Sequence, residues 1–334
     1  MTSNVAQKRL RILIAGGSGQ VGQLLARHIH GQGHLVTVLS RRPAPTPWQT
    51  LQWNGREVTE WARSIDGSDV VINLAGRSVN CRYTQKNRRE IMESRVLSTR
   101  AVGQAIAAAK SAPALWMNAS TATIYRHAED RDMDERTGEL GGKELNVPAE
   151  WRFSIEVATA WEREFFNAAT PRTRKISLRS AMTMSPDQGG IFATLLRLVR
   201  FGLGGSAGSG KQFVSWIHGQ DFTRAIDFMI THKEIDGCVN VCSPNPLPNR
   251  EFMRDLREAG GARLGLPASQ WMLAIGARLI RTETELILKS RRVVPGRLLE
   301  HGFDFVFADW PSAAGDLVKS WRANNRRQSH LRTI

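Results

Sequence analysis

The sequence predicts an α/β fold, a doubly wound parallel sheet with a smaller, mainly helical C-terminal domain. Strand-like and helix-like segments alternate along the chain, as a parallel sheet requires. The first apolar run, residues 10–15, ends directly in a glycine-rich turn, and a helix-like segment at residues 23–30 follows. At 334 residues the chain is long enough to bury a full core and to carry one large and one smaller domain.

The individual elements follow from apolar runs and from apolar residues at helical spacing. Strands are expected at residues 10–15, 35–39, 69–74, 114–120, 175–179 and 239–242. Helices are expected at residues 23–30, about 84–110, 149–168, 191–203, 222–230, 249–259 and 269–280. The predicted domains are a core of residues 1–185 and about 213–245, a smaller substrate-side domain of about 186–212 and 246–325, and a frayed basic tail at 326–334.

The turn after the first strand has the glycine spacing of a dinucleotide-binding loop. Gly16 permits a tight turn, Gly19 lets the backbone approach a pyrophosphate, and Gly22 lets the helix pack closely on the strand. The helix N-terminus adds N–H groups and the positive end of its dipole. The cofactor-binding residues expected here are Gly16, Ser18, Gly19, Gln20, Val21 and Gly22. The alternative is a glycine-rich turn that binds no ligand.

The end of the second strand indicates which dinucleotide is preferred. A site for NAD usually places Asp or Glu there, on the ribose 2′-hydroxyl, but this chain has Ser40, Arg41 and Arg42. A carboxylate would repel a 2′-phosphate, whereas a guanidinium can bind it in a bidentate, charge-assisted contact worth about 1.5–3 kcal/mol. We therefore expect NADP(H) in preference to NAD(H). The alternative is that these arginines only solvate a loop.

Hydropathy, cysteine content and net charge indicate where the protein is located and what kind of ligand it binds. No apolar stretch approaches the ~20 residues of a membrane span, and no signal-peptide core precedes the first strand, so a cytoplasmic protein without a membrane partner is expected. Three cysteines fit a reducing compartment. Cys238 and Cys242 have no second cysteine pair or histidine cluster nearby, so we expect core packing and no metal. The net charge of +15 suits an anionic ligand, and nucleic acid is the less favoured reading.

A second glycine-rich segment, residues 205–212, nearly matches a phosphate-binding P-loop. Gln212 stands where a Ser or Thr hydroxyl should bind magnesium, and a helix precedes the loop where a strand should. We expect a flexible glycine loop that lines a cleft and not a nucleoside-triphosphatase site.

Together these motifs resemble the epimerase-family atypical short-chain dehydrogenases/reductases, which are nucleoside-diphosphate-sugar epimerase-like proteins with a C-terminal domain of unknown role. The motifs that carry the likeness are residues 16–22, 40–42, 73–76, 94–96, 161–162, 201–210, 215–218, 244–246, 292–295 and 298–300. The resemblance implies a Rossmann core and NADP(H) binding that includes Leu74, Ala75 and Gly76. It also implies a cleft for a sugar-nucleotide-like substrate.

The resemblance also shows what this chain lacks. The wider superfamily uses a Tyr four residues before a Lys, and the Lys lowers the Tyr pKa so that the phenol can move a proton. Neither of the two tyrosines, Tyr83 and Tyr125, has a Lys at that spacing. Counted back from residues 161–162, the pair falls at Ser154 and Ala158, neither of which can fill its role.

Other residues are candidates to replace the missing pair. Ser120, at the end of a strand, matches the substrate-orienting Ser/Thr of the superfamily. Tyr125 lies just beyond it, in the loop that the resemblance expects to face the nicotinamide, and His127 follows. Ser120 and Tyr125 are the catalytic candidates. The alternatives are an aromatic packed on the cleft wall for Tyr125 and surface exposure for His127.

The segment at residues 215–218 supplies two candidates for the substrate cleft, Trp216 and His218. A purely structural histidine is the alternative for His218. Asp221 is expected to cap the helix that follows.

Three functions are therefore weighed. The first is an NADP-dependent nucleotide-sugar epimerase or oxidoreductase that acts on a small molecule with an unusual proton donor. The alternative is a non-catalytic NADP(H)-binding sensor or scaffold, and a nucleic-acid-binding protein rests on charge alone. The substrate and the oligomeric state are left open by the sequence.

Overall fold

The computed structural model describes residues 8–145, 147–268 and 285–331, so the helix expected at residues 269–280 lies outside the described residues. The chain divides into two compact units. The first comprises Met1–Arg77, Glu93–Ala119 and Trp161–Ser177, and the second comprises Ser78–Met92, Ser120–Ala160 and Leu178–Ile334. The domain division expected from the sequence follows other boundaries and stays a prediction.

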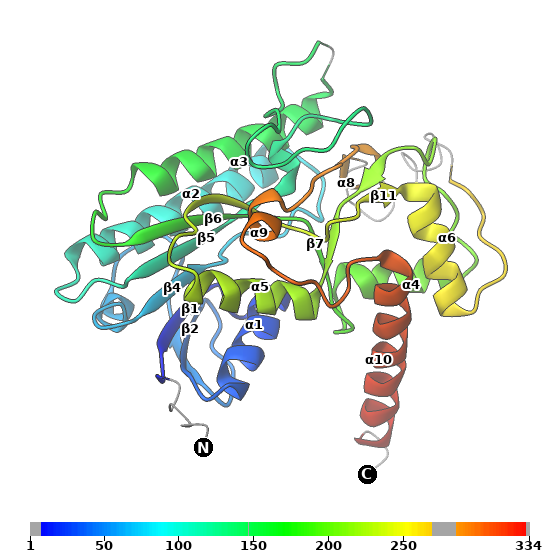
Figure 1. Ribbon diagram of the computed structural model, residues 1–334. Coiled ribbons are helices and arrows are strands. Elements are labelled where there is room, and N and C mark those ends of the chain that lie inside the picture. Colours follow the sequence, from blue (N-terminus) through cyan, green and yellow to red (C-terminus); the bar gives the residue numbers. More distant parts are fainter. Residues whose placement is uncertain (1–7, 146, 269–284, 332–334) are drawn as a thin grey trace. The chain divides into compact units, whose positions relative to one another are not determined.

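A seven-stranded sheet runs in the order β3-β2-β1-β4-β5-β6-β10. Figure 1 labels five neighbouring strands of this sheet, β2, β1, β4, β5 and β6. Its strands are β1 (Arg11–Ala15), β2 (Leu35–Ser40), β3 (Gln49–Gln52), β4 (Val70–Asn73), β5 (Leu115–Thr121), β6 (Arg174–Ser180) and β10 (Gly237–Val241). β1 lies between β2 and β4 and pairs with both in parallel. The chain adds β2 and β3 on one side of β1, and then adds β4, β5, β6 and β10 on the other side. This is the doubly wound Rossmann order, which confirms the predicted fold class.

Helix α1 (Gln20–Gly31) shows why the first unit packs as it does. Its buried residues Gly22, Leu25, Ala26 and Ile29 recur at helical spacing and form one face. The core of the unit also contains Trp116. The other helices that begin or end in this unit are η1 (Glu60–Ser64), α2 (Gln85–Ala108) and α3 (Ala149–Asn167).

Most of the second unit's other elements are helices. They are η2 (Ala122–Ile124), α4 (Ile191–Arg200), α5 (Gly219–Thr231), α6 (Asn249–Gly260), α8 (Glu285–Leu288), α9 (Gly296–Glu300) and α10 (Trp310–Leu331). Two short strand pairs, β7 (Met182–Met184) with β9 (Trp216–His218) and β8 (Phe213–Val214) with β11 (Leu247–Pro248), complete it. Helix α6 packs against both α4 and α10 (Figure 1), and the core between them contains Phe252 and Trp310.

The C-terminal segment corrects one expectation. Residues 326–331 were expected in a frayed basic tail, but α10 continues through Leu331. The helix is anchored at its start, where Trp310, Ala313, Ala314 and Leu317 are buried in the core of the second unit. A helix anchored over two turns can extend through charged residues, because Arg and Lys are good helix formers. None of the described helices is both long and apolar enough to cross a membrane.

Candidate functional site

The glycine turn after β1 needs glycine at Gly16 and Gly22 for reasons within the chain itself. Gly16 has a φ of +77°, and a Cβ there would lie 2.8 Å from both Cα and N of Ala75. A Cβ on Gly22 would lie 2.5 Å from Cα of Gly17. These contacts hold the turn, the loop after β4 and the start of α1 together.

Gly19 differs from Gly16 and Gly22, because the space that a Cβ would occupy there is open. A Cβ on Gly19 would meet only the carbonyl oxygen of Gly16, at 3.5 Å. Gly19 is also the N-cap of α1 and supplies no side chain to the helix N–H groups, and the first turn contains no acidic residue. Beside it, the buried Nε2 of Gln20 has no hydrogen-bond partner in the described part of the chain. The accessible backbone at Gly19, the N-terminus of α1 without a side-chain cap and the unpaired amide donor of Gln20 together fit a bound diphosphate.

The end of β2 presents two free cations. Arg41 and Arg42 are exposed, and neither takes part in an ion pair within residues 8–145, 147–268 and 285–331. Ser40 is buried and fixes the turn, since its Oγ donates to the carbonyl oxygen of Arg42 at 3.0 Å and accepts from its N–H at 3.2 Å. The serine therefore shapes the turn that carries the two guanidinium groups.

The loop after β4, which contains Leu74, Ala75 and Gly76, is held by side chains from α2. Arg95 donates from Nη1 to the carbonyl oxygen of Arg77 at 3.1 Å, and Ser94 Oγ accepts the N–H of Arg77 at 2.9 Å. A Cβ on Gly76 would lie 3.3 Å from Cζ of Arg95. The guanidinium of Arg95 also lies over the ring of Trp161, 5.1 Å from its centroid.

A buried polar network, which sequence analysis missed, also holds the loop after β4 in place. Asn73 Nδ2 donates to Oδ1 of Asn118 at 2.8 Å and to Oγ1 of Thr99 at 3.2 Å. Thr99 also accepts from Nε1 of Trp161 at 2.9 Å. Asn73 Oδ1 accepts the N–H of Ala75 at 3.1 Å. Polar residues among apolar ones on neighbouring strands were the available signal for this network.

In the second unit, the catalytic candidate Tyr125 is buried, with 1% of its surface exposed. Its hydroxyl donates to Oδ1 of Asn240 at 2.9 Å and accepts from Nη1 of Arg179 at 2.9 Å. Burial raises the pKa of Tyr125 to about 12, against the opposing effect of Arg179. This geometry favours the alternative, an aromatic that packs and bonds inside the fold.

The neighbours of Tyr125 are also held in place. Ser120 is buried at the end of β5. His127 is half-buried, stacks on Trp151 with 5.1 Å between ring centroids, and accepts the N–H of Ser290 on Nδ1 at 3.1 Å. Burial lowers the pKa of His127. His127 is therefore a partner of the C-terminal segment and not the solvated side chain that was its alternative.

The two cleft candidates lie inside the second unit. Trp216 is fully buried and packs edge-to-face on Trp310 at 5.0 Å between centroids. His218 is the N-cap of α5 and accepts the N–H of Gln220 on Nδ1 at 3.1 Å. Burial lowers the pKa of His218, and its Nε2 lies 3.3 Å from Asp316. Both geometries favour structural roles.

The cap of α5 was assigned wrongly from the sequence. The helix begins at Gly219, so Asp221 lies in its first turn and not at its cap. The Asp221 carboxylate accepts the N–H groups of Val306 at 3.0 Å and Phe307 at 2.8 Å. It ties the segment before α10 to α5.

The P-loop-like segment is also built into the second unit. The Gly208 N–H donates to the carbonyl oxygen of Ala268 at 2.8 Å. Buried Gln212 uses its Nε2 for the carbonyl oxygen of Ala207 at 2.9 Å. Its amide therefore closes the loop, where a P-loop would place a magnesium ligand.

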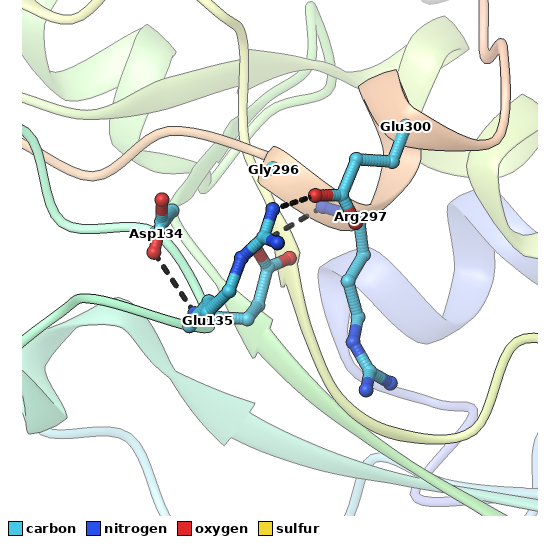
Figure 2. A pocket seen from close by; sticks show the side chains of 6 residues that line it. Asp134, Glu135, Gly296, Arg297 and Glu300 are labelled. Atoms are coloured by element: carbon cyan, nitrogen blue, oxygen red, sulfur yellow. Dashed lines mark hydrogen bonds and ion pairs between the residues drawn. The ribbon is translucent and has the colours of Figure 1, made fainter.

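A hollow of about 310 Å³ in the second unit is lined by six residues, which Figure 2 shows: Asp134, Glu135, Arg136, Gly296, Arg297 and Glu300. Its charged groups are already paired. Glu135 accepts the N–H groups of Asn240 at 2.7 Å and Arg297 at 3.2 Å, and Arg136 forms an ion pair with Glu300. These bonds fasten α9 to the unit. Within the described residues, no group of three or more His, Cys, Asp or Glu side chains could hold a metal ion.

Comparison with known proteins decides the family. Residues 12–242 match the model of the NAD dependent epimerase/dehydratase family. This chain belongs to that family. Residues 268–317 match a domain of unknown function, DUF1731, which confirms the resemblance described from the sequence motifs.

Relatives match the epimerase-family chain along nearly its whole length. It is 27% identical over 312 residues to the Bacillus subtilis epimerase family protein YfhF, covering 92% of this chain and 98% of the relative. It is 28% identical over 316 residues to the human epimerase family protein SDR39U1, covering 92% and 100%.

Two solved structures share the fold of this epimerase-family chain. A crystal structure of human SDR39U1 with NADPH superimposes with a TM-score of 0.81 at 27% identity, covering 93% of this chain and 99% of that one. UDP-N-acetylglucosamine 4-epimerase from Bacillus cereus superimposes with a TM-score of 0.71 at 16% identity, covering 94% and 99%.

In this family member, Ser154, where the resemblance led us to expect the tyrosine, belongs to a buried polar cluster that sequence analysis did not identify. Ser154 donates from Oγ to Oε2 of Glu285 at 2.5 Å. Lys289 donates from Nζ to the carbonyl oxygen of Thr123 at 2.7 Å, and Nη2 of Arg291 lies 3.7 Å from Oε1 of Glu285. Glu285 and Lys289 are each 1% exposed. Burial raises the pKa of Glu285 and lowers that of Lys289 to about 7.

Proposed function

We propose that this chain binds NADP(H) in preference to NAD(H) and acts as a nucleotide-sugar epimerase or oxidoreductase on a small molecule. The observation that carries the proposal is the pair of exposed guanidinium groups, Arg41 and Arg42, at the carboxyl end of β2, unpaired within the described residues. A 2′-phosphate is the part of NADP(H) that would pair with them. The NADPH in the human SDR39U1 structure supports the same choice of cofactor.

Different residues of the first unit bind different chemical groups of the cofactor. The open turn at Gly19 and the N-terminus of α1 hold the diphosphate, and Gln20 gives its unmet amide donor to the ligand. Arg41 and Arg42 hold the 2′-phosphate, while the loop from Leu74 to Gly76 forms the wall on the side of β4. When bound, the nicotinamide supplies or takes up a hydride at a substrate carbon.

The substrate side of the proposal rests on the family and on charge. The family model describes epimerases and dehydratases, and a net charge of +15 favours an anionic substrate such as a nucleoside-diphosphate sugar. A cytoplasmic location is part of the proposal, because none of the three cysteines forms a disulfide, as in a reducing compartment.

The test reverses one charge at the end of β2. Arg41→Asp should weaken NADPH binding at least ten- to a hundredfold, because a contact of about 1.5–3 kcal/mol is replaced by repulsion, and should leave NADH binding nearly unchanged. Arg63→Asp, at another exposed position of the first unit, changes the net charge equally and should affect neither. Equal effects of Arg41→Asp on both cofactors would contradict the proposal.

The second candidate is a non-catalytic NADP(H)-binding sensor or scaffold. The residues that favour it are Ser154 and Ala158, which occupy the positions where a count back from residues 161–162 leads us to expect the Tyr and Lys of the superfamily. Its expected behaviour is tight NADPH binding without consumption of NADPH in the presence of carbonyl compounds.

A further inference from the structure

Trp161, on α3, contacts two separate supports of the loop after β4. Its indole Nε1 donates to Oγ1 of Thr99, which belongs to the buried network that ends at the N–H of Ala75. Its ring lies against the guanidinium of Arg95, which donates to the carbonyl oxygen of Arg77. All of these residues belong to the first unit, and only 5% of the Trp161 surface is exposed. One buried side chain is therefore linked to both ends of the loop.

The hydrogen bonds of the buried network run in a single direction. Nδ2 of Asn118 donates to the carbonyl oxygen of Ala119 at 2.9 Å, and because a carbonyl only accepts, Oδ1 of Asn118 faces the network. That oxygen accepts the proton of the Thr99 hydroxyl at 3.2 Å, so Thr99 can only accept from its other partners. These partners are the indole N–H of Trp161 and Nδ2 of Asn73, both of which are donors.

The direction of the network decides which atom Asn73 presents to the loop. Nδ2 of Asn73 donates to Thr99 and to Asn118, so Oδ1 is the atom that accepts the N–H of Ala75 at 3.1 Å. A reversed amide would place two donors against each other there. The N–H of Trp161 completes the arrangement, because without it a fully buried hydroxyl oxygen loses a partner and the Thr99 hydroxyl is free to turn.

The other end of the loop depends on the ring of Trp161. The Cζ atom of Arg95 lies 5.1 Å from the ring centroid, where the aromatic face attracts a cation. Nη1 of Arg95 donates to the carbonyl oxygen of Arg77 at 3.1 Å. A Cβ on Gly76 would lie 3.3 Å from the same Cζ atom, so the guanidinium packs directly on the loop. Loss of the ring would therefore loosen this support as well.

We propose, resting on the NADP(H)-binding function above, that Trp161 is a positioning residue for the cofactor loop, defined as residues 74–77. Trp161 acts through the buried network on one end of the cofactor loop and through Arg95 on the other. If the loop keeps its binding shape in only a fraction of the molecules, the apparent affinity for the cofactor falls by that fraction. The cofactor loop is a wall for any dinucleotide, so NADPH and NADH depend on Trp161 to the same extent.

The test separates the indole N–H from the ring. Trp161→Phe removes the N–H and keeps a ring against Arg95, and calorimetric titration should show NADPH and NADH binding both weakened about three- to tenfold. Trp161→Leu removes the ring as well and should weaken both further. Arg41→Asp is expected to act on NADPH alone, so a defect of the cofactor loop is distinguishable from a defect at the 2′-phosphate.

The matched control is Trp116→Phe, the same change of side chain in the core of the same unit. Trp116 is fully buried, and its Nε1 has no hydrogen-bond partner within the described residues. Measured well below the unfolding temperature, this variant should bind both cofactors with wild-type affinity. Thr99→Val should reproduce the defect of Trp161→Phe, whereas Thr99→Ser keeps the hydroxyl and should restore wild-type affinity.

Hydrogen exchange tests the same arrangement without cofactor. The N–H of Ala75 is bonded to Asn73, so its exchange should be faster in folded Trp161→Phe and Thr99→Val protein than in wild type. Trp116→Phe should keep the wild-type rate at Ala75. Thr99→Val is the second variant if Trp161→Phe fails to fold.

Three outcomes would overturn the inference. Wild-type protein that binds NADPH, with affinities unchanged in Trp161→Phe and Thr99→Val, contradicts the role of Trp161 and leaves the cofactor proposal standing. Equal losses of affinity in Trp161→Phe and Trp116→Phe would assign the defect to general damage of the core. Wild-type protein that binds neither cofactor contradicts both this inference and the proposed function.

Discussion

Gly16 and Ala75 approach so closely that a Cβ on Gly16 would lie 2.8 Å from the Ala75 backbone. This contact joins the turn after β1 to the loop after β4, and Gly16 also has a positive φ. The two loops expected to bind the cofactor therefore share one packing constraint that only glycine meets.

Gly16→Ala should thus lower both stability and NADPH affinity. The strained backbone costs about 1–3 kcal/mol, and relief of the clash would displace the loop that contains Ala75. Thermal unfolding and an NADPH titration measure the two effects. Gly31→Ala, at a position where a Cβ would meet nothing within 4 Å, is the control and should be neutral in both.

Tyr125→Phe should destabilise the fold. The hydroxyl of Tyr125 lies between Asn240 and Arg179, and its removal takes one partner from each inside the protein, which costs about 1–3 kcal/mol. Urea unfolding of the variant measures the change. Unaltered stability together with loss of turnover would restore Tyr125 as the catalytic residue expected from the sequence.

Lys289 should make stability depend on pH above neutrality. Its pKa is lowered from 10.5 to about 7 in the folded chain, so between these values the unfolded chain binds more protons at this residue. The contribution of Lys289 to the free energy of unfolding therefore increases from pH 7 to pH 10. Urea unfolding at several pH values should show a smaller slope in Lys289→Met than in wild type. Lys319→Met, at an exposed position of α10, should keep the wild-type slope.

The cofactor half of the site could be predicted because its determinants are local in sequence. The glycine turn, the absence of an acid at the end of β2 and the alternation of strands and helices each lie within a short window. Strand β3 was missed, because its sequence Gln-Thr-Leu-Gln has no run of apolar residues and is ordered by pairing with β2. The tail was misassigned for a related reason. Its charged and polar residues show no apolar periodicity, and they continue a helix that is anchored in the core at Trp310.

The buried polar cluster around Glu285 could not be predicted in the same way. Ser154 and Glu285 are 131 positions apart in sequence, and only the fold brings them within 2.5 Å. Spacing rules detect a Tyr and a Lys on one helix, but they cannot detect a cluster whose members come from α3, from α8 and from the segment after α8. The pKa shifts of Glu285 and Lys289 likewise arise from burial, which residue type alone does not predict.

The most direct test of the central claim is a calorimetric titration of the wild-type protein with NADPH and with NADH. The account predicts micromolar binding of NADPH that is clearly tighter than binding of NADH, because Arg41 and Arg42 meet the 2′-phosphate. Equal affinity for both would contradict the role of these arginines. Binding of neither would mean that the Rossmann core of this chain no longer holds a dinucleotide.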